Sequence, residues 1–484
     1  MSLRFYDTAT AQTRDFVPIR KGEVGLYYCG ATVQGMPHVG HIRSAIAFDQ
    51  LTRWLTASGY RVTTVRNVTD IDDKILARAQ ESVHDDALPP QLRGEQWWAL
   101  AYRYELEFQR AYDTLGVRRP TYEPRATGHI PEMHSLIQLL IDRGHAYPAN
   151  DESGDVYFDV RSWKGYGALT RQNIDDMQSA TDVEPEFVNR KRDPRDFALW
   201  KGWKVGEPET AAWPSPWGPG RPGWHLECSA MVTKYLGTEF DIHGGGLDLR
   251  FPHHENEMAQ SQAAGHPFAR YWMHNGMVTF EGEKMSKSIG NTVSPSDMLE
   301  LASPRVVRYY LGQAHYRSVL DYRPTSLQEA AAAVERIDGF LSKAAAREFP
   351  TGFGYISPGA PDAFRAAMND DLNVPQALAV LHDTVRAGNT ALASGDSEAT
   401  KKAFIDVMTM TRILGLDDVQ DPGKGPRSPE YRALDTLIKS PLQQRTMARE
   451  TKDWAQADAI RDALTSAGIL IEDTADGVAW TLKN

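Results

Sequence analysis

A strand, a loop, a helix and a second strand follow one another near the start of this chain, and this order constrains the fold more than any other feature. The apolar and aromatic run Val24–Cys29 predicts a strand, and the glycine- and proline-containing stretch from Gly30 to Pro37 predicts a loop. From Gly40 to Ala57, apolar residues recur every three or four positions, as on one face of a helix, before the strand-like alternation of Tyr60–Val68. Such a βαβ unit builds a parallel sheet, and ligands bind where its strands end.

The length of the chain, 484 residues, predicts more than one domain, because single hydrophobic cores rarely grow beyond about 250–300 residues. Strand-like signals return at Phe240–His243, Tyr271–His274 and Met277–Phe280, and we expect these segments to complete the same sheet. The stretch from Arg118 to Lys204 is more polar and irregular, which indicates an inserted subdomain.

Alanine-rich helical periodicity dominates the later part of the chain, over Ser326–Ala346 and Pro361–Leu414. Two linkers rich in glycine and proline, Phe349–Ala360 and Asp417–Pro429, interrupt it. We therefore expect an α/β fold with three parts. These are a Rossmann-like parallel-sheet catalytic domain over residues 1–324 with an insertion at about 118–204, an α-helical domain over 325–416, and a small C-terminal module over 429–484.

The composition indicates a globular protein of a reducing compartment. Fifty-three basic against 64 acidic residues give a formal charge of −11, which argues against loose, charge-driven binding of nucleic acid but not against a shaped RNA surface. No segment approaches the roughly 20 apolar residues that span a bilayer, and Met1–Phe16 lacks the hydrophobic run of a signal peptide. Two cysteines cannot form a disulfide framework, so we expect a cytoplasmic protein without membrane association.

Two loops contain the residues expected of a phosphate-binding site. Segment 37–41 (PHVGH) lies where the first strand passes to the first helix, and the N–H groups and dipole of a helix terminus attract phosphate. Segment 283–288 (EKMSKS) is a polar loop whose two lysines could close over a polyphosphate. Either loop alone is more often a helix cap or a solvated turn, but the two together favour a nucleotide site.

Four residues from separate segments could bind a metal ion. His253 and Glu257 stand four positions apart and share one face if a helix begins just before them, and both side chains are good zinc ligands. Cys29 ends the first predicted strand, and Cys228 follows a loop rich in tryptophan and proline. His254 is a rival ligand if the turn is tighter. Each residue alone is more often structural, the cysteines as small buried thiols and the His–Glu pair as a surface pair.

Together these motifs resemble the class I aminoacyl-tRNA synthetases, whose signatures are a His-x-Gly-His loop and a Lys-Met-Ser-Lys-Ser loop. Longer segments narrow the resemblance to the cysteinyl-tRNA synthetases, and it spans nearly the whole chain. These segments are 28–30 (YCG), 67–74 (NVTDIDDK), 223–230 (GWHLECSA), 240–248 (FDIHGGGLD) and 251–257 (FPHHENE).

The resemblance implies a role for each of the matching residues. One zinc ion per chain would be ligated by Cys29, Cys228, His253 and Glu257. ATP would be bound by His38, Gly40, His41, Asp248, Lys284 and Lys287, among which the catalytic groups are His38, His41, Lys284 and Lys287. The pocket for the amino acid would include Gly30, Thr32, Thr69 and Trp224.

The implied reaction joins L-cysteine to ATP with the help of Mg²⁺, releases pyrophosphate, and transfers cysteine from the adenylate to tRNA(Cys). The helical domain and the C-terminal module would contact the tRNA, the module at the anticodon. Zinc would distinguish cysteine from serine, because an apolar pocket cannot reject such a near-isostere and a zinc-bound thiol loses its proton. Four protein ligands close a zinc site, so we expect Glu257 to be the weak ligand that the substrate sulfur displaces. We also expect a monomer without an editing domain.

Two other functions fit part of the pattern. A ligase of mycothiol biosynthesis that joins cysteine to an amino sugar would share the catalytic half but would not need the module over 429–484. A non-catalytic tRNA-binding protein with a structural zinc ion would need neither signature loop, so the presence of both argues against it.

Overall fold

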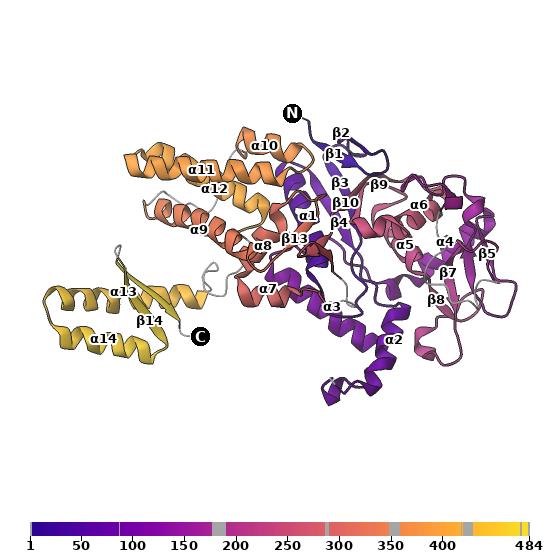
Figure 1. Cartoon of the computed structure of the whole chain (residues 1–484), viewed down its shortest axis with the longest axis horizontal. Helices are drawn as coiled ribbons and strands as arrows, with labels where there is room; N and C mark the ends of the chain where they lie inside the picture. Colours follow the sequence, from indigo (N-terminus) through magenta and orange to yellow (C-terminus); the bar gives the residue numbers. More distant parts are fainter. Residues whose placement is uncertain are drawn as a thin grey trace.

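The computed structural model describes residues 2–86, 88–176, 190–285, 290–347, 359–417, 419, 429–474 and 477–482 (Figure 1). A four-stranded sheet lies at its centre, in the order β10-β9-β3-β4, and every neighbouring pair is parallel. These strands are β3 (Glu23–Tyr28), β4 (Arg61–Arg66), β9 (Glu239–Gly246) and β10 (Phe268–Asn275). The topology confirms the predicted α/β fold with a Rossmann-like parallel sheet.

The predicted βαβ unit is present as β3, α1 (Val39–Ala57) and β4. Side chains of β3 alternate between two cores, since Leu26 and Tyr28 belong to the main core with α1, whereas Tyr27 packs with Cys228 of α5 (Trp224–Leu236). Helices α1 and α5 lie on either side of the sheet (Figure 1). Because both faces are covered, the strand carries no charged or hydrophilic side chain after Glu23, and it ends one residue before Cys29.

The insertion contains an antiparallel sheet of four short strands. After α2 (Asp73–Glu81), α3 (Trp97–Thr114) and α4 (Ile130–Asp142), the strands follow in chain order as β5 (Ala146–Pro148), β6 (Val156–Phe158), β7 (Phe197–Gly202) and β8 (Gly220–Pro222). Strand β8 lies beyond residue 204, where we expected the insertion to end. Its Gly-Arg-Pro sequence has no strand signal, and only pairing with β7 makes it a strand.

One expected strand belongs to a different sheet. Strand β11 (Val278–Phe280) does not extend the parallel sheet; it pairs with β12 (Glu283–Lys284) and β13 (Leu320–Tyr322). The chain leaves β10 at Gly276, whose N–H donates to Tyr316 O at 2.7 Å. A Cβ atom there would lie 2.3 Å from Ser318 O, so glycine permits this close backbone approach. The expectation that Met277–Phe280 completes the central sheet was therefore wrong.

The N-terminal hairpin of β1 (Arg4–Asp7) and β2 (Gln12–Asp15) packs beside β10. Helices follow β11; the periodicity predicted those from residue 326 onward but not the two that precede it. These helices are α7 (Pro295–Leu301), α8 (Pro304–Gln313), α9 (Ser326–Ala345), α10 (Asp362–Asn369), α11 (Val374–Ser394) and α12 (Ser397–Leu414). Between them, most of the linker expected at Phe349–Ala360 lies outside the described residues.

A buried ion network joins the helical region to the catalytic sheet. The Asp49 carboxylate of α1 accepts from Arg53 Nε at 2.7 Å and from Arg308 of α8, and all three side chains are at most 2 % exposed. Arg308 also donates to Leu414 O, at the end of α12, at 3.2 Å. Through Asp49 and Arg308, this network connects α1, α8 and α12.

The C-terminal module has a small core of its own, formed by Ile438, Leu464 and Ile469. Its elements are α13 (Pro429–Glu450), α14 (Trp454–Ser466), β14 (Ile469–Thr474) and β15 (Gly477–Leu482). The linker expected before it, at Asp417–Pro429, lies mostly outside the described residues.

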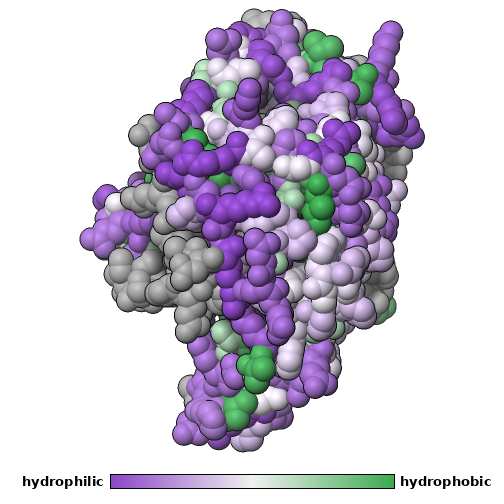
Figure 2. Space-filling view, turned by 90° about the vertical axis from the view of Figure 1, so that its right-hand side faces the viewer, coloured by the Kyte–Doolittle hydropathy of each residue, from purple (hydrophilic) through white to green (hydrophobic). Residues whose placement is uncertain are grey.

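The face seen in Figure 2 is mostly hydrophilic, with hydrophobic residues in small separate groups. Among the described residues, no helix has the length and apolar character needed to cross a membrane.

Candidate active site

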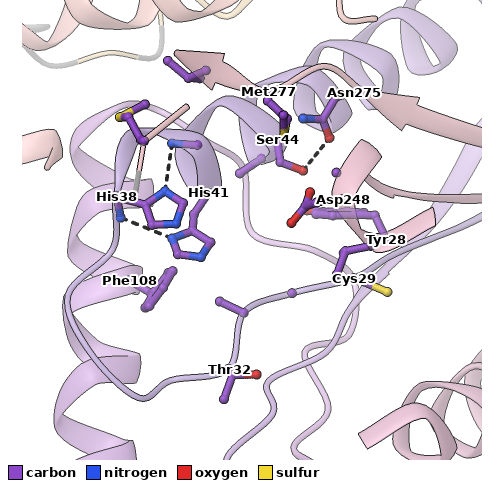
Figure 3. A pocket seen from close by; sticks show the side chains of 18 of the residues that line it. Tyr28, Cys29, Thr32, His38, His41, Ser44, Phe108, Asp248, Asn275 and Met277 are labelled. Atoms are coloured by element: carbon purple, nitrogen blue, oxygen red, sulfur yellow. Dashed lines mark hydrogen bonds between the residues drawn. The ribbon is translucent and has the colours of Figure 1, made fainter. Parts of the chain in front are cut away.

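A cavity of about 410 Å³ opens where the parallel strands end, as the βαβ pattern predicts (Figure 3). Many predicted site residues line it: Cys29, Gly30, Thr32, His38, Gly40, His41, Trp224, Asp248 and Lys284. Thr69 lies behind this wall and does not line the cavity. Segment 286–289, which includes Lys287, lies outside the described residues.

The two histidines of the first signature form one side of the cavity. Their rings stack with centroids 3.6 Å apart, and Phe108 of α3 packs edge-on against His41 (Figure 3). His38 Nδ1 accepts from Gly40 N and His41 Nδ1 accepts from His38 N, each at 3.2 Å. Both rings therefore cap helix α1, and each keeps its Nε2 on the ring edge away from the cap. Capping and phosphate binding are compatible here, because the positive end of α1 faces the same cavity.

Strand β12 brings Lys284 of the second signature to the cavity wall. The opposite side includes Asp248, after β9, and Asn275, at the end of β10. Asn275 Oδ1 accepts from Ser44 Oγ of α1 at 2.8 Å (Figure 3). The sequence interpretation missed Asn275, Ser44 and Lys74; a search for polar residues at every strand end would have found Asn275.

The four proposed metal ligands come together beside this cavity. The candidate ligand atoms of Cys29, Cys228, His253 and Glu257 all lie within 4.8 Å of one another. Helix α6 (His253–Ala263) begins at the first histidine, and the expected helical spacing places His253 Nε2 3.0 Å from Glu257 Oε1. The two sulfur atoms are 4.0 Å apart, so both thiols are free.

A second set of possible ligands shares two of these residues. Cys29 and Glu257 also cluster with His243 and His254, and His254 Nε2 lies 3.2 Å from Cys29 Sγ. The sequence interpretation considered His254 only as a partner of Glu257 through a tighter turn, whereas the structure brings it to Cys29. The other ring nitrogen of His254 is 2.8 Å from His274 Nε2, so this ring is already engaged on both edges.

Further histidines surround the ligand group. His243 Nε2 lies 2.9 Å from Glu257 Oε2, and His225 Nδ1 lies 3.0 Å from His253 Nδ1. Residues that hold the ligands of a metal in place typically contact them in this way. The sequence interpretation missed His225, His243 and His274, although each stands in or next to a segment that it had singled out.

The electrostatics of the group favour a bound cation. Although burial alone would raise it, hydrogen bonds from Cys29 and His253 lower the pKa of Cys228 to about 6. Against the effect of burial, His243 and His253 lower the pKa of Glu257 to about 2, while Glu257 and Cys228 raise the pKa of His253 to about 10. A proton on His253 thus offsets only one of the two negative charges, those of the Cys228 thiolate and the Glu257 carboxylate. A divalent cation would offset both, and two sulfurs with an imidazole and a carboxylate fit zinc.

The predicted residues of the amino-acid pocket lie around these ligands. Trp224 is the first residue of α5, and its ring stacks on His253 with centroids 4.2 Å apart. Thr32 and Thr69 form a β-bridge, which holds the loop after β3 against the segment after β4. The structure therefore brings Trp224, Gly30, Thr32 and Thr69 into one neighbourhood.

Comparisons with known proteins identify this arrangement. A family model for the class I (C) tRNA synthetase catalytic domain matches residues 15–332, a DALR domain model matches 363–417, and a cysteinyl-tRNA ligase anticodon-binding domain model matches 434–480. The cysteine–tRNA ligase of Paenarthrobacter aurescens strain TC1 is 72% identical over 487 residues, covering 100% of both chains. That of Micrococcus luteus is 64% identical over 492 residues, again across both chains. The chain belongs to the cysteinyl-tRNA synthetase family.

Solved structures of other synthetases share its fold. Methionyl-tRNA synthetase of Mycobacterium tuberculosis in complex with methionyl-adenylate aligns with 82% of this synthetase and 90% of its own chain, with a TM-score of 0.55 and 18% identity. A putative arginyl-tRNA synthetase from Campylobacter jejuni covers 83% and 93% of the two chains, with a TM-score of 0.55 and 14% identity. The matched anticodon-binding domain disfavours the sugar ligase, and the matched catalytic domain together with the full-length ligase relatives disfavours the non-catalytic binder.

Proposed function

We propose that this synthetase activates L-cysteine with ATP, forms cysteinyl-adenylate and pyrophosphate, and transfers cysteine to the 3′ end of tRNA(Cys). One observation carries the proposal: a helix N-terminus with two histidines and a group of two thiols, an imidazole and a carboxylate adjoin the same cavity. The helix N-terminus would bind phosphate, and the group of thiols, imidazole and carboxylate would hold a soft metal ion that binds the substrate thiol.

Zinc would be held by Cys29, Cys228, His253 and Glu257, and when bound it would supply a soft Lewis acid that prefers a thiolate to a hydroxyl. Glu257 is the ligand best suited to give way. Its Oε2 has a partner in His243 at 2.9 Å, so the carboxylate keeps a hydrogen bond if Oε1 leaves the metal. Cys29, His243, His254 and Glu257 form the alternative set, which we do not favour because it offers zinc one thiol in place of two.

The remaining residues would orient ATP for attack by the cysteine carboxylate on the α-phosphate. His38, Gly40 and His41 at the N-terminus of α1 would hold the phosphates, with Mg²⁺, and Asp248 would face the nucleoside. Lys284 and Lys287 would neutralise the charge that builds on the departing pyrophosphate. The position of Lys287 in the Lys-Met-Ser-Lys-Ser signature supports this role.

Replacing Lys287 by alanine is expected to slow cysteine-dependent ATP–pyrophosphate exchange by about 100-fold or more, because one charged donor to a transition state contributes that much. Equilibrium binding of cysteine should survive, because the residues proposed to bind the substrate thiol belong to other segments of the chain. Lys343→Ala removes an exposed lysine of α9 and should leave both measurements unchanged. Unaltered exchange in the Lys287 variant would refute the role assigned here.

Deleting residues 429–484 is expected to lower charging of tRNA(Cys) by two orders of magnitude or more while exchange without tRNA stays within about twofold. The module has its own core, separate from that of the catalytic domain, so its removal leaves the activation site folded. Serine in place of cysteine is the control for specificity. Charging of tRNA(Cys) at the rate of the intact chain would contradict a role of the module in tRNA binding, and exchange without tRNA charging in the intact chain would argue for a different acceptor, such as an amino sugar.

A further inference from the structure

Lys74, the second residue of α2, lines the cavity without an ionic partner. Its side chain is exposed, and it ends segment 67–74 (NVTDIDDK). Within the described residues, no carboxylate forms an ion pair with the Lys74 ammonium group. An exposed lysine is a flexible point charge with three hydrogen-bond donors, so this group can bind an anion that enters the cavity.

The two carboxylates beside Lys74 are committed to other groups. Asp72 Oδ1 accepts from the backbone N of Lys74 at 2.9 Å and caps α2. Asp73 pairs with Lys201 of β7, and with Arg221 of β8 at 2.9 Å. Helix α2 therefore lies between α3 and the insertion, and its first turn is fixed to the insertion (Figure 1). These bonds hold the base of the Lys74 side chain at the cavity wall.

The charges on the cavity wall favour anionic ligands. Asp248 is the one acid among the described residues that line the cavity, whereas Arg66, Lys74 and Lys284 are cationic. Arg66 is already paired with Glu123 at 2.6 Å, and its side chain is only 3 % exposed. The two exposed ammonium groups, those of Lys74 and Lys284, thus remain for ligands.

The sheet places these two lysines at opposite ends of the cavity. Lys284 belongs to β12, whose partner β11 follows β10, whereas Lys74 comes after β4. Strands β10 and β4 are the two edges of the central sheet, and three strand spacings separate them by about 14 Å. Asp248 and Lys284, which we assign to ATP, belong to the end formed by β9 and β10. Lys74 at the other end fits a second anion.

The second step of the proposed reaction brings a second anion to this cavity. The 3′ end of the tRNA must reach cysteinyl-adenylate, and a negatively charged phosphodiester precedes its terminal nucleotide. The chain has a net charge of −11, so long-range attraction does not hold that end in place. A cation at the site itself is needed, and a charge-assisted hydrogen bond to phosphate supplies both attraction and position.

We propose that Lys74 binds the last phosphodiester of tRNA(Cys) and thereby positions the terminal ribose for acyl transfer. The proposal rests on the proposed function and deepens its second step. In that step, a ribose hydroxyl forms an ester bond to the cysteinyl carbonyl carbon, and the bond from this carbon to AMP breaks. AMP leaves with the electron pair, and the hydroxyl proton passes to its phosphate. Lys74 takes part in no bond that forms or breaks.

The first test measures transfer separately from activation in the zinc-loaded full chain. With cysteinyl-adenylate formed beforehand and tRNA(Cys) below saturation, Lys74→Gln should slow transfer about tenfold or more, because a hydrogen bond between charged groups is lost. Lys74→Arg keeps the charge and should recover most of the rate. Pyrophosphate exchange without tRNA should fall less than threefold in either variant.

Arg78→Gln is the matched control on the same helix. Arg78 is exposed and lies one turn further along α2, but it does not line the cavity. Its replacement removes the same charge and should change transfer less than twofold. An equal loss in the Arg78 variant would show only general attraction of the tRNA and would overturn the proposal.

The second test changes the tRNA and leaves the protein intact. A methylphosphonate at the last linkage of tRNA(Cys) removes the phosphodiester charge, and transfer by the parent chain should fall about as much as in Lys74→Gln. Combining the two changes should cause little further loss, because both remove the same contact.

Three outcomes would overturn the proposal. These are transfer that is unchanged in Lys74→Gln, effects of the variant and the modified tRNA that multiply in full, and a loss of exchange as large as the loss of transfer, which would assign Lys74 to ATP. Failure of the proposed function would look different, since the parent chain itself would then show no cysteine-dependent exchange or no charging of tRNA(Cys).

Discussion

Replacing Cys228 by serine is expected to remove zinc from the purified chain and to lower cysteine-dependent pyrophosphate exchange by at least 100-fold. A serine hydroxyl is a poor ligand for zinc, and changes even to residues that only support a metal ligand cost 10- to 100-fold. Cys228 is fully buried, so no water can easily replace its sulfur. The loss also leaves Glu257 and His253 without their thiolate neighbour. Elemental analysis for zinc per chain, together with exchange assays, would measure both effects.

His254→Ala is the matched variant, because it distinguishes the two possible ligand sets. With zinc on Cys29, Cys228, His253 and Glu257, the His254 variant should retain its metal and Cys228→Ser should lose it. The reverse pattern would place the ion among Cys29, His243, His254 and Glu257 and would contradict our assignment. Zinc near zero in the active parent chain would refute the metal site altogether.

Replacing Asp49 by alanine is expected to lower the free energy of unfolding by about 3–5 kcal/mol, the cost of removing one partner from a buried ion pair. The change leaves Arg53 and Arg308 as buried charges without their carboxylate, and both are about 1 % exposed. It also removes the acceptor of Arg118 N, at 3.1 Å, which fixes the chain beyond α3. Equilibrium urea unfolding followed by tryptophan fluorescence would measure the change.

Asp383→Ala provides the control on the surface of α11. Asp383 pairs with Arg386 at 2.6 Å, but the two side chains are 67 % and 78 % exposed, so solvent screens the interaction. Its loss should change the free energy of unfolding by no more than about 0.5 kcal/mol. An Asp49 variant as stable as this control would mean that the network connecting α1, α8 and α12 contributes little.

Much of the site follows from sequence because its residues stand at positions that local patterns define. The helical spacing of His253 and Glu257 and the location of Cys29 at a strand end needed only the periods of helix and strand. The histidine loop was found in the same way, because a βαβ unit always presents a helix N-terminus beside its strand end.

Other features depended on contacts between segments that are far apart in the sequence. Local periodicity does not predict such contacts. Strand β11 matches a strand pattern, but whether it joins the central sheet is decided at Gly276, where the backbone of residues 316–318 approaches. Likewise, Asp49 meets Arg308 across 259 positions, and Thr69 meets Glu227 across 158.

The sequence by itself therefore determined the fold class, the phosphate loop and the four candidate zinc ligands, because each rests on spacing along one element or on a long motif. Only the tertiary structure decided which histidines surround those ligands and which arginine of α8 meets Asp49 in the interior. The physical reason is that a buried polar group must find its partners among the segments that pack around it, and these segments are far apart in the sequence. That property belongs to the packed arrangement of all neighbouring segments and to no segment alone.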